Sequence, residues 1–329
     1  MNRNVTIVMY HFVRDLVHSR YPEIKGLTVE GFKGQIDYIK RHYNIIKMQD
    51  LIAAISSKDL IIPPRAVLLT FDDGYIDHYT NVFPLLSNAG LQGSFFPSAR
   101  AIEDYEVLDV NKIHFILASV QDKSAIIKSI FTTLDESRRQ YNLNDNNTYY
   151  SELAVPNRFD SADVIFIKRM LQWALPEDLR IKITNSLFKK FVTKDESAFS
   201  TELYMNIDQL ICMKQNGMFI GNHCYNHRWM DKLTTEEQIK EVDMSLQFLQ
   251  KIGVGEVGWV MCYPYGAYNE SMMPLLKARG CVAGLSVEVR IADLDQDNPL
   301  ALPRLDTNDL PKTGDLQPNE WTMKAGGWA

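Results

Sequence analysis

The order in which strand-like and helix-like patterns alternate is the feature that most constrains the fold of this chain. Short apolar runs, typical of buried strands, recur between segments whose apolar residues repeat every three to four positions. Because parallel strands need a helix-length crossover between them, this alternation predicts βα units around a parallel sheet. The predicted strands span residues 5–10, 44–47, 66–71, 93–97, 218–221, 259–263 and 281–287. Seven or eight strands in this order indicate an α/β fold, and within that class a distorted (β/α) barrel.

The alternation is interrupted in the middle of the chain. From residue 101 to residue 205 the pattern is almost entirely helical, so we expect an α-helical insertion there. The barrel would then be discontinuous, built from residues 1–100 and 206–310. Past Pro311 the sequence is polar with scattered glycine and proline, and we expect residues 311–329 to form a loose C-terminal tail.

Charge, hydropathy and cysteine spacing exclude several classes of protein. The net charge is −6 and no basic run is interleaved with aromatic residues, so no nucleic-acid partner is expected. The first apolar stretch is too short for a signal-peptide core, and no segment approaches the roughly 20 apolar residues of a membrane span. The four cysteines show neither CxxC spacing nor a disulfide-dense pattern. We therefore expect a reduced, cytoplasmic location, in which a surface glycan would be met as a precursor.

Two adjacent carboxylates follow the predicted strand 66–71. Active sites of parallel βα folds lie at the carboxyl ends of the strands, which is where this pattern places Asp72 and Asp73. Such a pair can divide metal ligation and base catalysis between its members. Asp-Asp-Gly is also a common turn sequence, so the pair supports a catalytic site only in combination with polar residues at other strand ends.

Three further strand ends carry polar or turn-forming residues. His223 and His227 are four residues apart and can reach one metal if their segment forms a helical turn or a tight loop. A Pro-Tyr-Gly turn with Pro264 and Tyr265 follows a later strand, and His11 ends the first strand. Taken singly, each of these features has a structural explanation as a chance spacing, a plain turn or a structural histidine.

The combination points to one chemistry. One aspartate and two histidines supply three ligands to a divalent metal and leave an open position for water. The second aspartate of the pair could then act as the base. The sequence therefore predicts a metal-dependent hydrolytic site at the carboxyl ends of the strands.

Three motifs, TFDDGY at 70–75, HxxxH at 223–227 and YPYG at 263–266, occur in an order that resembles the polysaccharide deacetylase family. The opening MYHFV and the later LPRLD resemble the branch of that carbohydrate esterase family that acts on poly-N-acetylglucosamine and similar surface glycans. The resemblance covers about residues 5–100 and 205–306 and leaves the helical insertion unmatched. It implies a distorted barrel, usually of seven strands, which agrees with the alternation.

The resemblance also implies roles for the polar residues. Asp73, His223 and His227 match the positions of the metal ligands. The metal would be zinc by first expectation, with nickel, cobalt or manganese as alternatives. Asp72 matches the general base that takes a proton from water. The family also uses a backbone N–H near the tyrosine of the Pro-Tyr-Gly motif to assist the oxyanion, which points to Pro264 and Tyr265 here.

Two departures from the family pattern concern an arginine and a catalytic acid. Many members carry an arginine two residues before the proline of the Pro-Tyr-Gly turn, where this chain has Cys262. Arg304 in LPRLD is the obvious substitute as the partner of the catalytic aspartate, and the alternative is a surface arginine in a loop. Many members also use a C-terminal histidine as the general acid, but no histidine follows His227. The role would fall to His11, to His78 or to a water, or the acid is missing, and we favour His11.

These features predict a hydrolase that removes an N-acetyl or similar acyl group from a sugar in cell-surface polysaccharide biosynthesis. Its partner would be an N-acylated sugar, a nucleotide sugar or a lipid-linked glycan precursor. The alternatives are a deformylase or O-deacetylase acting on a sugar precursor, and a non-catalytic glycan- or metal-binding homologue that lacks the acid. The helical insertion would shape the substrate site or mediate oligomer formation.

Overall fold

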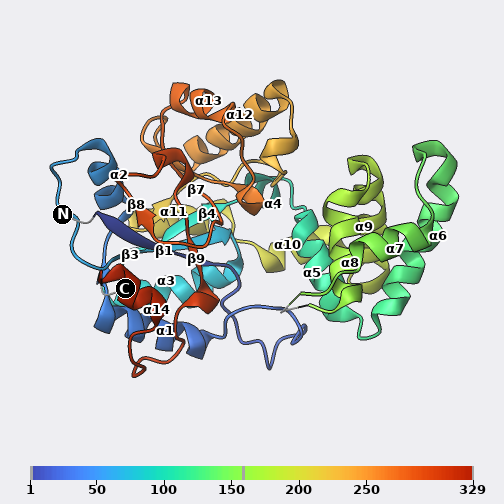
Figure 1. Ribbon diagram of the computed structural model, residues 1–329, viewed down its shortest axis with the longest axis horizontal. Helices are drawn as coiled ribbons and strands as arrows, with labels where there is room; N and C mark the ends of the chain where they lie inside the picture. The colour runs from blue at the N-terminus through green and yellow to red at the C-terminus, as the bar shows by residue number, and fades with distance from the viewer. Residues whose placement is uncertain (1–2, 158–159, 328–329) are drawn as a thin grey trace. The chain divides into compact units, whose positions relative to one another are not determined.

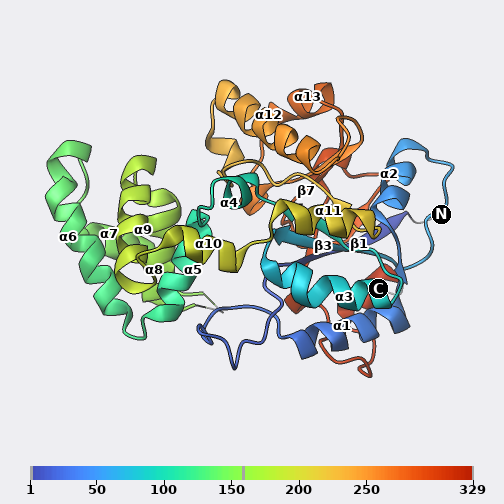
Figure 2. The ribbon, with the colours of Figure 1, turned by 180° about the vertical axis from the view of Figure 1, so that it is seen from behind.

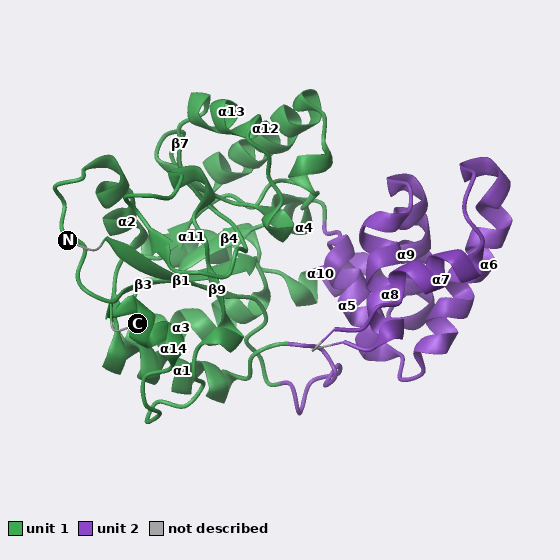
Figure 3. Ribbon diagram, in the orientation of Figure 1, with its two compact units in different colours: residues 1–15, 26–104, 201–329 green, residues 16–25, 105–200 purple. Residues whose placement is uncertain are grey.

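The computed structural model describes residues 3–157 and 160–327 and has an α/β fold. The chain forms two compact units (Figure 3). Unit 1 comprises Met1–Asp15, Gly26–Asp104 and Thr201–Ala329, and unit 2 comprises Leu16–Lys25 and Tyr105–Ser200. None of the helices in the described ranges combines the length and the apolar character that crossing a bilayer requires.

Unit 1 is built around a ring of short parallel strands, which confirms the distorted barrel predicted from the alternation. Neighbouring strands pair in the order β5, β4, β3, β1 and β9, and β6 pairs with β7 in a second sheet. Single bridges, Asn222 with Met261 and Leu285 with Leu302, join the two sheets. The strands of this ring are β1 (Asn4–Tyr10), β3 (Ala66–Asp73), β4 (Ser94–Pro97), β5 (Phe219–Ile220), β6 (Trp259–Cys262), β7 (Cys281–Leu285) and β9 (Leu305–Asp306).

Several strands are shorter than the apolar runs that predicted them. The run at 44–47 contributes only β2 (Asn44–Ile45), which pairs with the first two residues of β3. The two-residue strand β8 (Ala292–Asp293) is antiparallel to β1, and neither it nor β9 was predicted. Packing is close just after β5, where a Cβ on Gly221 would lie 2.3 Å from a ring carbon of Phe96. The barrel is therefore irregular, because several of its strands have only two residues.

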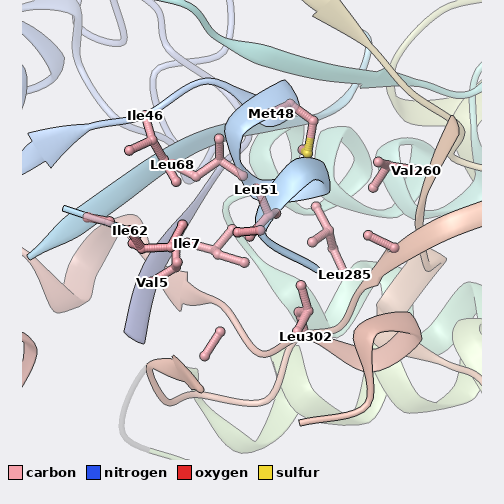
Figure 4. Close-up of a cluster of buried hydrophobic side chains, with 14 of the residues drawn as sticks. Val5, Ile7, Ile46, Met48, Leu51, Ile62, Leu68, Val260, Leu285 and Leu302 are labelled. Carbon is pink, nitrogen blue, oxygen red and sulfur yellow. The ribbon is translucent and has the colours of Figure 1, made fainter. Parts of the chain in front are cut away.

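The interior of the barrel is filled by alternate residues of the strands. Val5 and Ile7 of β1 share one buried apolar cluster with Ala66 and Leu68 of β3 (Figure 4). Because side chains alternate along a strand, Thr70 and Asp72 continue the inward face of β3 beyond Leu68. All eight residues of β3 are buried, as expected for a parallel strand covered on both sides. The inward face of β3 thus changes from apolar to polar as it approaches the carboxyl end.

Helices cover the outside of the barrel, with α1, α3 and α14 on one side of the strands and α12 and α13 on the other (Figures 1 and 2). Thr234 and Glu237 form a capping box at the start of α12. The helices of unit 1 are α1 (Val29–His42), α2 (Met48–Ser56), α3 (Phe83–Asn88), α4 (Ala99–Glu103), α11 (Ile207–Gln215), α12 (Thr235–Lys251), α13 (Met272–Ala278) and α14 (Glu320–Ala325).

The segment after Pro311 is not the loose tail that we expected. It contains α14, and Thr322 of this helix is buried and exchanges hydrogen bonds with the hydroxyls of Tyr38 and Tyr43 at 2.8 and 2.9 Å. Six residues are too few for a stable helix in isolation, so tertiary packing on α1 explains why this polar segment is ordered.

Unit 2 is a helical bundle with its own apolar core. The segment 16–25 belongs to it because the Tyr21 ring packs edge-on against Phe115 and Phe199, with centroids 5.0 and 5.9 Å away. The buried Lys112 ammonium is 2.7 Å from the Glu196 carboxylate. The helices of this unit are α5 (Asp109–Ser119), α6 (Lys123–Tyr141), α7 (Asn146–Leu153), α8 (Ala162–Arg169) and α9 (Glu177–Phe191), and α10 (Glu196–Leu203) continues into unit 1.

Candidate metal centre

The carboxyl ends of the barrel strands bring the predicted polar residues to one edge. Asp72 and Asp73 end β3, and His11 directly follows β1. The two histidines of HxxxH follow β5, and the Pro-Tyr-Gly turn follows β6. Arg304 directly precedes β9, which starts near the carboxyl end of β1, where Leu305 pairs with Val8. Because these strands are parallel neighbours in the ring, residues far apart in the sequence converge there.

Three of these residues form a compact donor set. The Asp73 Oδ1 atom lies 3.2 Å from His223 Nε2 and 3.3 Å from His227 Nε2, and all three residues are buried. The other carboxylate oxygen of Asp73 accepts a hydrogen bond from the Tyr75 hydroxyl. On the far side of its ring, His223 Nδ1 donates to the Cys262 carbonyl oxygen at 2.7 Å. Each of these bonds leaves the opposite atom, Oδ1 or Nε2, directed at the shared point.

This donor set fits a divalent metal. Without a metal, His223 Nε2 can donate a proton to the Asp73 carboxylate; with its proton on Nδ1 alone, the same atom would present a lone pair to a metal shared with that carboxylate. Burial alone would raise the pKa of the Asp73 carboxyl, but hydrogen bonds from His223 and His227 hold it well below its usual range. One ligand atom from each of the three residues lies within 4.8 Å of the others. Two imidazole nitrogens and one carboxylate oxygen are a ligand set typical of zinc and related metals, with a position left for substrate or water.

Asp72 is held by Arg304 rather than by the histidines. Arg304 Nη1 and Nη2 donate to Asp72 Oδ1 and Oδ2 at 2.9 and 2.8 Å, and both side chains are buried. The Arg304 Nε atom donates to the Ser286 carbonyl oxygen at 2.8 Å, which fixes the plane of the guanidinium. Burial would raise the pKa of the Asp72 carboxyl, but Arg304 outweighs it and lowers that pKa to about 2. Asp72 is therefore an ionised, oriented acceptor next to the donor set.

The backbone bends sharply where these residues meet. Asp73 has a φ of 72°, which ends the strict alternation of β3 and lets neighbouring aspartates serve the same site. A Cβ on the following Gly74 would lie 2.8 Å from Pro97 Cβ, so only glycine fits there. Among the described residues, seven non-glycine residues have a positive φ, and four of them, Asp73, Cys224, His227 and Tyr265, belong to these motifs. Strained backbone of this kind concentrates at functional sites.

The Pro-Tyr-Gly turn lies beside the second histidine. The Tyr265 ring packs edge-on against the His227 imidazole, with centroids 4.8 Å apart, and stacks on the Trp229 indole at 4.3 Å. Pro264 is buried at the start of the turn. Sequence reasoning missed Trp229, because a tryptophan two residues after the HxxxH motif carries no pattern of its own.

The two candidate acids occupy different environments. His11 is half-buried, and its imidazole is an electrostatic neighbour of Asp72, Asp73 and His227. The His78 ring is fully buried, and its Nε2 donates to the His11 carbonyl oxygen at 2.9 Å. His78 thus supports the backbone of His11, and the pairing of Tyr10 with Phe71 in the parallel strands β1 and β3 sets His11 level with Asp72 at the strand ends.

Comparison with known proteins found one family model and several solved structures that match this chain. A family model described as polysaccharide deacetylase matches residues 62–136 and 181–284, more than half of the chain, although His11 and Arg304 lie outside these ranges. No curated protein matches the chain. The deacetylase PplD of Streptococcus pyogenes, solved in complex with acetate, is 16% identical with a TM-score of 0.56, and the match covers 93% of each chain. IcaB from Ammonifex degensii is 14% identical with a TM-score of 0.56, over 99% of this chain and 96% of that one. The BpsB deacetylase domain from Bordetella bronchiseptica is 16% identical with a TM-score of 0.51, over 92% and 95%.

Proposed function

The chain belongs to the polysaccharide deacetylase family, and on that premise we propose that it is a metal-dependent hydrolase that removes an N-acetyl or similar acyl group from a sugar of cell-surface polysaccharide biosynthesis. One observation carries the proposal: a buried donor set of Asp73, His223 and His227 lies beside Asp72, which Arg304 holds ionised. PplD and the BpsB domain, which have a similar fold, are described as deacetylases, and this supports the same class of reaction.

Asp73, His223 and His227 would hold the metal, with zinc as the first expectation and nickel, cobalt or manganese as alternatives. When bound, the metal would polarise the acyl carbonyl and make an attacking water more acidic. Tyr75 and the Cys262 carbonyl hold the far sides of Asp73 and His223, so the donor atoms need little rearrangement to receive it.

Asp72 would take a proton from the attacking water. Its low pKa makes it a weak base, so it depends on the acidity that the metal gives to that water. Arg304 contributes by fixing the position of both carboxylate oxygens, because proton transfer needs the acceptor within hydrogen-bond distance of the water.

His11 would donate a proton to the departing amine. An amine leaves an amide only after its nitrogen is protonated, so the second half of the reaction needs an acid at the site. A backbone N–H of the turn that contains Pro264 and Tyr265 would stabilise the oxyanion formed from the acyl carbonyl, on the side of His227. The stacked Tyr265 and Trp229 rings would form an apolar wall beside it.

We infer that unit 1 carries the activity and that unit 2 is the insertion that shapes substrate choice or oligomer formation. The four cysteines are free, which supports a reducing, cytoplasmic compartment. In that compartment the substrate would be a nucleotide sugar or a lipid-linked precursor that carries an N-acylated sugar. Deformylation or O-deacetylation of such a precursor would use the same chemistry.

The proposal is tested by measuring metal content and amine release together on a panel of acetylated sugars, formylated sugars and nucleotide sugars. Wild type is compared with Asp72→Asn and with Glu256→Gln, an exposed change in unit 1 that serves as the control. We expect wild type and control to bind metal and to release amine from at least one substrate, and Asp72→Asn to bind metal without releasing amine. Metal binding without amine release from any substrate would favour a non-catalytic homologue.

A further inference from the structure

The segment that follows β1 is tied to the turn after β3 by a buried ion pair. Arg14 Nε lies 2.7 Å from Asp77 Oδ2, and Arg14 Nη2 donates to Asp77 Oδ1 at 2.9 Å. The two side chains are only 16% and 6% exposed, so the pair is shielded from water. Burial raises the pKa of the Asp77 carboxyl even with both bonds from Arg14, so the carboxylate depends on this partner.

Hydrogen bonds from side chains to the backbone reinforce the ion pair at His11 and at Val13. His78 Nε2 donates to the His11 carbonyl oxygen at 2.9 Å, and Asn81 Nδ2 donates to the Val13 carbonyl oxygen at 2.8 Å. The backbone of the same segment also pairs with Leu27 through two bonds of 2.9 and 3.0 Å. The backbone of His11 is therefore fixed by hydrogen bonds to its own carbonyl oxygen and to those of Phe12 and Val13.

Aromatic packing links this segment to the metal centre itself. The Phe12 ring has the Arg14 guanidinium 4.5 Å from its centroid and stacks on Tyr75 at 3.9 Å. The hydroxyl of Tyr75 donates to Asp73, a member of the donor set. A continuous series of contacts thus runs from Asp77 through Arg14, Phe12 and Tyr75 to the proposed metal ligand.

We propose that Arg14 and Asp77 are positioning residues that hold His11 at the metal centre for proton delivery to the departing amine. This role rests on the proposed function. His11 needs such support because the chain leaves unit 1 after Asp15 and returns only at Gly26. The ion pair anchors the segment just before that departure, so that the backbone of His11 keeps a fixed distance from Asp72 and Asp73. A displacement of about 1 Å at a catalytic group can reduce a rate about 100-fold.

The test uses leaving groups that differ in their need for an acid. An amide nitrogen must be protonated to depart, whereas the phenolate of 4-nitrophenyl acetate departs without a proton. Asp77→Asn and Arg14→Gln are compared with wild type on the best acetamido sugar and on this ester, with metal content measured in each. Asp243→Asn is the matched control, because it breaks another two-bond Arg–Asp pair, with Arg279, elsewhere in unit 1. Arg14→Lys retains the charge and tests for partial rescue.

We expect kcat on the amide to fall about 10- to 100-fold in Asp77→Asn and Arg14→Gln, with KM, metal content and ester hydrolysis within about twofold of wild type. Arg14→Lys should recover part of the amide activity, and His11→Gln should show the same selective loss. Equal losses on amide and ester would overturn the positioning role and indicate general destabilisation. Unchanged amide activity would overturn it as well, while leaving the proposed function intact. No amine release by metal-loaded wild type would overturn the proposed function and, with it, this role.

Discussion

Unit 1 and unit 2 both bury charged side chains, but they satisfy them differently. In unit 2 the Lys112 ammonium, 2% exposed, is met by Glu196 at 2.7 Å and by the Asn185 side-chain oxygen at 2.6 Å. In unit 1 the Asp73 carboxylate faces the Nε2 atoms of two imidazoles, His223 and His227, and Asp73 has a φ of 72°. The buried ammonium of Lys112 is paired with side chains of its own bundle, so its role is structural. Buried ligand atoms that converge on one point indicate a binding site for a cation.

The largest effect should come from breaking the buried ion pair between Arg304 and Asp72. Arg304→Ala leaves the Asp72 carboxylate buried without its two donors. We expect the free energy of unfolding of unit 1 to fall by about 3 to 5 kcal/mol, together with loss of activity. Hydrogen exchange in increasing denaturant, followed on peptides of unit 1, measures this. Arg290→Ala, which removes a more exposed pair with Asp297, is the control and should cost less than about 1 kcal/mol. Equal losses in the two variants would contradict the account.

Removing a proposed metal ligand should reduce the activity more than the stability of the fold. His223→Ala deletes one of the two imidazoles that face Asp73. Deacetylation should fall by more than about 100-fold, the upper value for loss of a residue that only supports a ligand. Metal content by mass spectrometry and kcat/KM, with ester and amide substrates, check the prediction. Full activity at wild-type metal occupancy would show that His223 is not a ligand.

A smaller loss should follow when only the support of a ligand is removed. Tyr75→Phe keeps the ring that stacks on Phe12 but removes the hydroxyl that donates to Asp73. We expect metal affinity to fall about 10- to 100-fold, measured by competition with a chelator. Tyr43→Phe removes another buried hydroxyl of unit 1, which bonds to Thr322, and should leave metal affinity unchanged. An unchanged affinity in Tyr75→Phe would mean that Asp73 is oriented without this bond.

The smallest effect on function should come from the buried charge of unit 2. Lys112→Met removes the ammonium and keeps a flexible apolar chain of similar length. We expect unit 2 to lose about 1 to 2 kcal/mol of stability because Asn185 and Glu196 lose their donor, while metal binding and kcat stay at wild-type values. Hydrogen exchange on peptides of unit 2, beside a deacetylation assay, separates the two quantities. A fall in metal affinity would contradict the division of roles between the units.

The features that the sequence predicted are those encoded by local pattern. The strands that begin at Ala66 and at Trp259 follow from short apolar runs bounded by polar or turn-forming residues. Asp72, Asp73 and the two histidines were predicted to lie at the same edge of the sheet, because each follows a predicted strand and parallel strands end at the same edge. The resemblance supplied Arg304 as the partner of Asp72, and the structure joins them by two hydrogen bonds.

The remaining features depend on contacts between distant segments. Residues 16–25 belong to unit 2 through the ring contact of Tyr21 with Phe115, which is 94 positions further along the chain. No local sequence pattern predicts a contact between such distant residues. The two-residue strands β8 and β9 are too short to show alternation. The Arg14–Asp77 pair joins segments 63 residues apart. The helix α14 is stabilised by packing against α1, which its own six residues do not reveal.

The central claim is that the convergent donors of unit 1 form a metal centre, and calorimetric titration of the metal-free protein with zinc tests it most directly. The account predicts that wild type and Asp72→Asn each bind a single zinc ion per chain at the donor set, and that His223→Ala does not. No binding by wild type, or binding of equal affinity in His223→Ala, would contradict it.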